Sequence, residues 1–169
     1  NLNDPTCKSH IMQYYQGIKA GNIVAGYELM LMLGRLAREI SDTGYQEENG
    51  IKVDFGASEK RIRFIETKCR HSEAPYAGKP FLLELFQKAF IEAIFAIKIY
   101  DGELKKYVRK YQDVLFLVGR KNGKTPLIGA VCLAEWFCGE MGKKILCASN
   151  DYDQADLMYQ AIDAMREES

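Results

Sequence analysis

The segment at residues 118–125, VGRKNGKT, constrains the fold most strongly, because it follows an apolar run at residues 114–118 and precedes a helical pattern. A strand, a glycine-containing loop and a helix start in this order are the parts of a phosphate-binding loop, whose backbone N–H groups surround an anion. In such a loop Gly123 lets the backbone approach closely, the Lys124 ammonium reaches the terminal phosphates, and the Thr125 hydroxyl ligates the bridging magnesium. The sequence therefore predicts nucleotide binding.

The loop departs from the usual pattern at its start. That pattern begins with a glycine where this chain has Val118, and the glycine is displaced to Gly119. The alternative is an ordinary strand-to-turn junction, because Asn-Gly is a common turn dipeptide. The flanking strand and helix favour the phosphate loop, and Pro126 fits it, since a first-turn proline lacks only an N–H without an intrahelical partner. Lys121 and Asn122 complete the candidate nucleotide-binding loop.

Composition excludes several classes of protein. With 169 residues, 47% hydrophobic and 27% charged, the chain suits one domain, or a core plus a helical extension, and is neither disordered nor fibrous in character. Its 23 basic and 23 acidic residues balance, so contact with nucleic acid requires local patches. The chain contains no uninterrupted apolar run of about eighteen residues, the length that a membrane-spanning helix needs. We therefore expect a cytoplasmic protein.

The cysteines and histidines raise a metal-binding alternative. Cys7-x-x-His10 and Cys69-x-His71 together offer two sulfurs and two nitrogens for zinc. The spacing argues against this site, because a Cys-x-His pair is tight for two ligands on one ion. The five cysteines are an odd number in mostly apolar contexts, and we expect reduced, buried thiols.

The first part of the chain reads as helical. Helices are expected from a cap at Ser9 to residue 20, at 23–40, at 58–69 and at 84–98, with a polar loop at 41–50. In the third helix Ile62 and Ile65 point inward, and the basic residues are expected on a solvated face in preference to a phosphate contact. These basic residues are Lys60, Arg61, Arg63 and Lys68.

Gln87 and Phe86 lie upstream of the loop on the helix expected at 84–98. In motor ATPases that read adenine, a glutamine amide contacts the base edge while a nearby aromatic or apolar side chain covers its face. Taken alone, Gln87 is a surface helix residue. Its pairing with the loop favours the adenine-reading role.

A second basic region follows a turn at Asp101-Gly102. Lys105, Lys106, Arg109 and Lys110 alternate with Tyr107 and Tyr111. This pattern can bind nucleic acid, but a charged approach to the first strand is favoured. A second strand at 144–149 and a last helix through residue 167 then predict a right-handed crossover and a parallel sheet.

Together these motifs resemble the amino-terminal part of the large terminase subunit of tailed bacteriophages and prophages, the ATPase that drives DNA into capsids. The resemblance covers most of the chain. It rests on residues 21–26, 63–66, 69–71 and 77–81, on Leu83 with Phe86 and Gln87, and on residues 119–125, 148–150 and 153–155.

The resemblance implies an α/β fold. A mostly helical N-terminal region at 1–110, containing the glutamine segment at 80–98, is followed at 111–169 by the first part of a P-loop NTPase core. This core is a truncated βαβα parallel sheet. In the family the loop tolerates loss of the first glycine.

The resemblance also implies roles for matching residues. Lys124 contacts phosphate and Thr125 holds the magnesium of ATP, while Gln87 reads adenine. Lys124 and Arg120 are the candidate catalytic residues, because Arg120 matches a loop arginine thought to sense or stabilise the γ-phosphate. ATP and Mg²⁺ are the expected cofactors. Cys69 and His71 also recur in the resemblance, which favours a packing role for them over metal binding.

The implied partners are double-stranded DNA, the small terminase subunit and the portal protein, with a homo-oligomeric ring, in the host cytoplasm. No apolar run ending in paired acids follows residue 150, so we expect a fragment without the catalytic carboxylates. Such a fragment binds nucleotide weakly and turns it over poorly or not at all. The alternatives are a helicase-like P-loop motor and a non-enzymatic helical interaction module with a vestigial loop.

Overall fold

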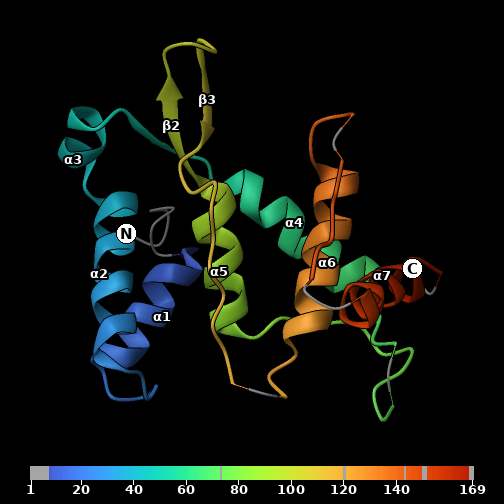
Figure 1. The fold of residues 1–169 in the computed structure, drawn as a ribbon. Coiled ribbons are helices and arrows are strands. Elements are labelled where there is room, and N and C mark those ends of the chain that lie inside the picture. Colours follow the sequence, from blue (N-terminus) through green and yellow to red (C-terminus); the bar gives the residue numbers. More distant parts are fainter. Residues whose placement is uncertain (1–7, 73, 120, 143, 150–151, 168–169) are drawn as a thin grey trace. The chain divides into compact units, whose positions relative to one another are not determined.

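The structure is a computed structural model that describes residues 8–72, 74–119, 121–142, 144–149 and 152–167. The elements are the helices α1 (His10–Lys19), α2 (Tyr27–Ser41), α3 (Thr43–Glu48), α4 (Phe55–Lys68), α5 (Leu85–Ala96), α6 (Lys124–Cys138) and α7 (Tyr152–Glu167), with the strands β1 (Ile51–Val53), β2 (Ile97–Asp101) and β3 (Lys106–Arg109) (Figure 1). The described residues form two compact units. The first unit draws on Asn1–Glu59 and Glu84–Leu115, and the second on Lys60–Leu83 and Phe116–Ser169. These units interleave along the sequence, and the domain boundary expected at residue 110 stays a prediction.

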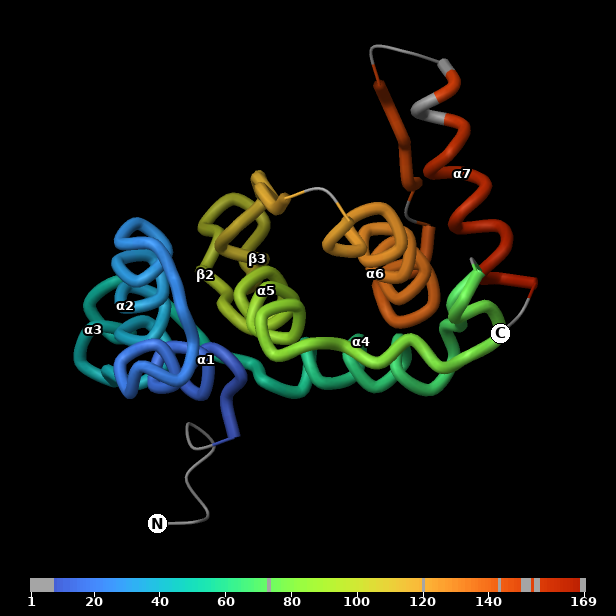
Figure 2. The backbone as a smooth tube through the Cα atoms, turned by 90° about the horizontal axis from the view of Figure 1, so that it is seen from below, coloured from blue at the N-terminus to red at the C-terminus, as the bar shows by residue number. Residues whose placement is uncertain are grey.

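The core of the first unit lies between α1, α2, α5 and the sheet. Helices α1 and α2 pack side by side in both views (Figure 1, Figure 2), and α5 packs against α1. Ser9 caps α1 as expected, because its hydroxyl accepts a hydrogen bond from Met12 N at 3.2 Å. The buried cluster contains Ile11, Leu33, Leu36, Ile40, Ile51, Ala89 and Ile97. These side chains come from three helices and two strands, so their burial joins distant segments of the chain.

The helix predictions are confirmed in kind, with errors in extent. Helix α4 begins at Phe55 and not at residue 58, and residues 97–98, expected at the end of a helix, begin β2. Helix α2 begins at Tyr27 and not at residue 23, because Gly26 has extended backbone and serves as its N-cap. The loop expected at 41–50 is wrong in part, since it contains α3. Asp42 caps this short helix by accepting a hydrogen bond from Tyr45 N at 3.0 Å.

The sheet is antiparallel, in the order β1-β2-β3. Ile51 pairs with Ile99 and Tyr100 pairs with Tyr107. The expected turn after β2 is confirmed, and Asp101 Oδ1 accepts hydrogen bonds there from the N–H groups of Glu103 and Leu104. The basic segment at 106–109 is therefore a paired strand of a hairpin, and its interpretation as a charged approach to the first strand is wrong.

The parallel sheet expected from the sequence is not seen in the described residues. The segments at 114–118 and 144–149 pair with no strand there. Leu115 and Leu117 are each 81% exposed, and Leu146 is 89% exposed. A central parallel strand gains its stability from ladders on its edges and cover on both faces. The described part of the chain gives these segments no ladder, and it leaves Leu115, Leu117 and Leu146 largely uncovered.

The second unit centres on α6, which packs against α7. The apolar residues buried here include Ile62, Ile65, Leu127, Ala130, Leu133, Ala134 and Met165. The inward orientation of Ile62 and Ile65 is confirmed. The expectation of a solvated face is wrong for Arg61, which is buried and donates from Nε and Nη2 to Glu135 Oε2 at 2.7 and 2.6 Å. This ion pair joins α4 to α6 within the unit.

The close approach of α7 to α6 at Gly129 supports a stability prediction. A Cβ at this buried position would lie 3.5 Å from Ile162 Cγ1 and 3.9 Å from Met165 Sδ, both ordinary contact distances. Gly129→Ala is therefore expected to stabilise the chain by about 0.5 to 1 kcal/mol, because alanine loses less backbone entropy in a helix. Gly129→Leu should instead destabilise it by about 1 to 3 kcal/mol through overpacking. Urea unfolding measures both, and a destabilising alanine would contradict the distances.

Asp54 gives the first unit a predicted acid dependence. Its carboxylate accepts hydrogen bonds from Ala57 N at 3.1 Å and from Lys98 Nζ at 2.5 Å. The Lys98 hydrogen bond is the main reason why the Asp54 pKa lies below its ordinary value of 3.8. A pKa that is lower in the folded state stabilises the fold above the unfolded-state value, and this contribution is lost as pH falls through the folded-state value.

We therefore expect the free energy of unfolding to decrease as the pH is lowered below about 4. Asp54→Asn should make this decrease smaller. Urea unfolding between about pH 7 and pH 3 measures the slope. Lys98→Met is the matched control, because it removes the same bond from the other side. An unchanged slope in both variants would show that other carboxylates set the acid dependence.

Candidate functional site

The loop before α6 has a backbone suited to an anion. Gly123, the N-cap of α6, is left-handed with φ 65° and ψ 30°, and Lys121 also has a positive φ of 66°. Asn122 lies between them and is not among the positive-φ residues. Backbone that changes handedness from residue to residue turns successive N–H groups toward a common concavity, which favours anions. A left-handed lysine also carries a steric cost, which makes this conformation informative.

The loop presents its side chains at the start of α6. Lys124 and Thr125 are exposed in the first helical turn, where the free N–H groups and the helix dipole attract negative charge. Asn122 Nδ2 donates to Gly119 O at 3.2 Å and closes the loop on itself. Pro126 occupies the first turn as expected. The arrangement can hold a phosphate and a metal ion bridging to it.

Arg120 lies outside the described residues. The helix expected after the loop is confirmed as α6, and Gly139 is its C-cap.

Gln87 is buried, so its interpretation as a surface helix residue is wrong. Its Oε1 accepts a hydrogen bond from Glu84 N at 2.9 Å, and the Glu84 side chain accepts in return from the backbone of Gln87. The pattern Glu84-x-x-Gln87 is a capping box, a signal present in the sequence that our reading missed. Phe86 beside it is half-buried. Gln87 and Phe86 belong to the first unit, whereas the loop before α6 belongs to the second.

Cys69 and His71 pack inside the second unit. Cys69 is fully buried, and burial raises the pKa of its thiol to about 11. The His71 ring lies 4.6 Å from the Phe81 ring and 5.7 Å from the Tyr76 ring, and burial lowers the His71 pKa. Within the described part of the chain, no three His, Cys, Asp or Glu side chains gather to hold a metal, and Cys7 lies outside it.

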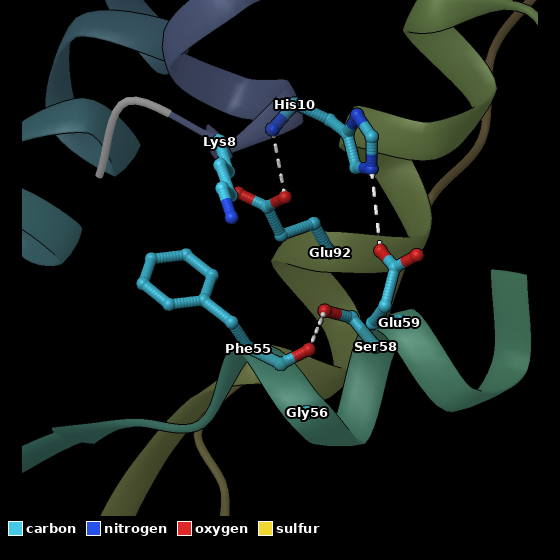
Figure 3. A pocket seen from close by; sticks show the side chains of 7 residues that line it. All are labelled: Lys8, His10, Phe55, Gly56, Ser58, Glu59 and Glu92. Carbon is cyan, nitrogen blue, oxygen red and sulfur yellow. Dashed lines mark hydrogen bonds and ion pairs between the residues drawn. The ribbon is translucent and has the colours of Figure 1, made fainter. Parts of the chain in front are cut away.

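A pocket of about 500 Å³ lies in the first unit (Figure 3). Its lining residues are Lys8, His10, Phe55, Gly56, Ser58, Glu59 and Glu92. The buried Glu92 carboxylate accepts from His10 N at 2.8 Å and from the Ser9 hydroxyl, so it holds the first turn of α1. His10 Nε2 lies 3.6 Å from Glu59 Oε2. Among the candidate residues from the sequence only His10 lines this pocket.

The described residues form a protein of mixed helices and antiparallel sheet, in which a loop with left-handed Lys121 and Gly123 precedes a helix. The family model of the terminase large subunit, ATPase domain, matches residues 86–167. This match covers just under half of the chain, and it supports the resemblance to the terminase large subunit drawn from the sequence. The matched region includes Phe86, Gln87 and the whole loop.

The chain has no match among curated proteins or among solved structures. No helix of the described residues has the length and apolar character needed to cross a membrane.

Proposed function

We propose that this chain is the nucleotide-binding part of a terminase large subunit that hydrolyses ATP to move double-stranded DNA into a capsid. The observation that carries the proposal is the loop before α6. It combines a left-handed Gly123, exposed Lys124 and Thr125, and a helix start, within the region that matches the ATPase domain. This combination suits Mg·ATP.

Each loop residue has a proposed role. The backbone from Gly119 to Gly123 surrounds the phosphates, with Lys121 and Asn122 holding its shape. Lys124 contacts the terminal phosphates and Thr125 ligates the magnesium. Arg120 stabilises charge on the γ-phosphate. Bound Mg·ATP supplies the phosphoanhydride bond whose hydrolysis powers translocation.

The adenine contact needs a specific arrangement of Gln87. Its amide oxygen is already engaged by Glu84 N, so the amide nitrogen would donate to the base while Phe86 covers the ring. We also propose that the exposed apolar segments at 114–118 and 144–149 are strands of a parallel sheet in the assembled ATPase. Their exposed leucines support this, because such strands are buried on both faces.

Hydrolysis requires one carboxylate for magnesium and one to activate water. No apolar run ending in paired acids follows residue 150. We assign Mg·ATP binding to the loop before α6, and we propose a ring, the small subunit and the portal as the assembly in which a terminase large subunit acts.

Calorimetric titration with Mg·ATP, Mg·GTP and metal-free ATP tests the proposal. We expect Mg·ATP to bind and Mg·GTP to bind more weakly. Removal of magnesium should lower the affinity for ATP, and phosphate release should stay at the background rate. Absence of any nucleotide binding would favour the non-enzymatic helical module. Rapid phosphate release would show that this chain also supplies the carboxylates for hydrolysis.

A further inference from the structure

The three-stranded sheet of the first unit has one face in the core and one in solvent. Residues opposite one another in an antiparallel pair share a face, so the register assigns each side chain to a side. Ile51 and Ile97 occupy the inner side and are buried. The opposite side, here termed the outer sheet face, carries Lys52, Lys98, Tyr100, Tyr107 and Arg109.

Two tyrosines form the aromatic part of the outer sheet face. Tyr100 is 51% exposed and Tyr107 is 44% exposed, and their rings meet edge to face with centroids 5.4 Å apart. Lys52 Nζ lies 5.2 Å from the centre of the Tyr107 ring. A cross-strand aromatic pair can stabilise a hairpin with its rings covered, so hairpin stability does not require the tyrosine rings to be exposed. The exposed ring surface is thus available to a planar ligand.

Cations lie on the same sheet face as these rings. Lys52 and Arg109 are exposed, and the Arg109 guanidinium lies 5.5 Å from the centre of the Phe95 ring, which positions it. Lys98 is bonded to Asp54, the nearby carboxylate. The whole chain has no net charge, so the excess of positive charge on the outer sheet face is local and does not reflect a basic protein.

We propose that the outer sheet face binds an unpaired nucleic-acid strand, with its cations on the phosphates and its tyrosines against the bases. Figure 1 shows the β2–β3 hairpin extending beyond the end of α5. Exposed aromatic rings on a sheet, flanked by cations, suit unstacked bases, because every base has a face that can stack. A duplex offers its phosphates but keeps its bases stacked and covered. The site uses none of the residues proposed for nucleotide binding.

Fluorescence anisotropy with a labelled oligothymidylate of about 15 nucleotides and a duplex of equal length tests the proposal on the full chain. We expect the single strand to bind more tightly than the duplex. With two to three cations on phosphates, the logarithm of affinity should fall with the logarithm of salt concentration at a slope of about −1.4 to −2.1. Equal or tighter binding of the duplex would overturn the proposal.

Substitutions separate stacking from charge. Tyr100→Ala and Tyr107→Ala should each weaken single-strand binding at least about fivefold, whereas Tyr100→Phe should retain it. Lys52→Glu with Arg109→Glu should abolish binding. The control is Arg63→Glu with Lys68→Glu, the same charge change on exposed residues of α4.

An equal loss in that control would show nonspecific attraction and overturn the proposal, as would alanine variants that bind like the wild type. Unfolding midpoints confirm that each variant is folded. Lys124→Ala should leave single-strand binding unchanged, so a failure of the proposed nucleotide site is distinguishable from a failure of this one.

Discussion

Replacing Lys124 by alanine is expected to weaken Mg·ATP binding by about 30-fold or more and to leave the unfolding midpoint unchanged. Removing one charged partner of a close ionic contact costs about 2 to 5 kcal/mol, and tenfold in affinity corresponds to about 1.4 kcal/mol. Lys124 is exposed in the first turn of α6, so its side chain contributes little to the fold. Isothermal titration calorimetry measures the affinity.

The matched control is Lys144→Ala, which removes an exposed lysine described in the second unit outside the loop. It should bind Mg·ATP like the unchanged chain, since it removes the same charge at another position. Retained affinity in Lys124→Ala would contradict the phosphate-loop assignment.

Glu92→Ala is expected to lower the free energy of unfolding by about 3 to 5 kcal/mol. The Glu92 side chain is 2% exposed, and its oxygens accept from His10 N at 2.8 Å, from Ile11 N at 3.4 Å and from the Ser9 hydroxyl. Each hydrogen bond to a charged group contributes about 1.5 to 3 kcal/mol, and the carboxylate also faces the positive end of the α1 dipole. Urea unfolding at neutral pH measures the loss.

Two variants make this prediction specific. Glu92→Gln keeps one acceptor oxygen but loses the charge, and should cost about half as much. Glu59→Gln changes a carboxylate that lines the same pocket but is 64% exposed, and should cost less than about 0.5 kcal/mol. A loss below about 1 kcal/mol in Glu92→Ala would show that α1 is held mainly by apolar packing.

Much of the fold could be read from local patterns. Ser9 marks the start of α1 through a hydrogen bond confined to one turn, and it was predicted correctly. The errors have another origin. Arg61 belongs to a basic run that looks solvated, but Glu135 lies far along the sequence and pairs with it in the fold. The Gln87 prediction missed the reciprocal bonds with Glu84, although their spacing was visible.

The candidate site was predictable to a similar extent. Gly123, Lys124 and Thr125 follow from the loop sequence and its helix, and the family match includes them. The left-handed Lys121 could not be predicted, because that conformation is costly for a lysine and depends on its surroundings. The proposed nucleic-acid face was equally hidden, since Lys52 meets the hairpin tyrosines only through strand pairing.

By itself the sequence determined most of the helices, the loop before α6 and the family resemblance, because spacing, caps and glycine positions act over a few neighbouring residues. Only the tertiary structure decided that residues 97–109 form an antiparallel hairpin and that the Glu92 side chain is buried. It also decided which face of the sheet carries Tyr100 and Tyr107. The physical reason is that burial and strand pairing depend on segments distant in sequence, whose mutual contacts no local pattern contains.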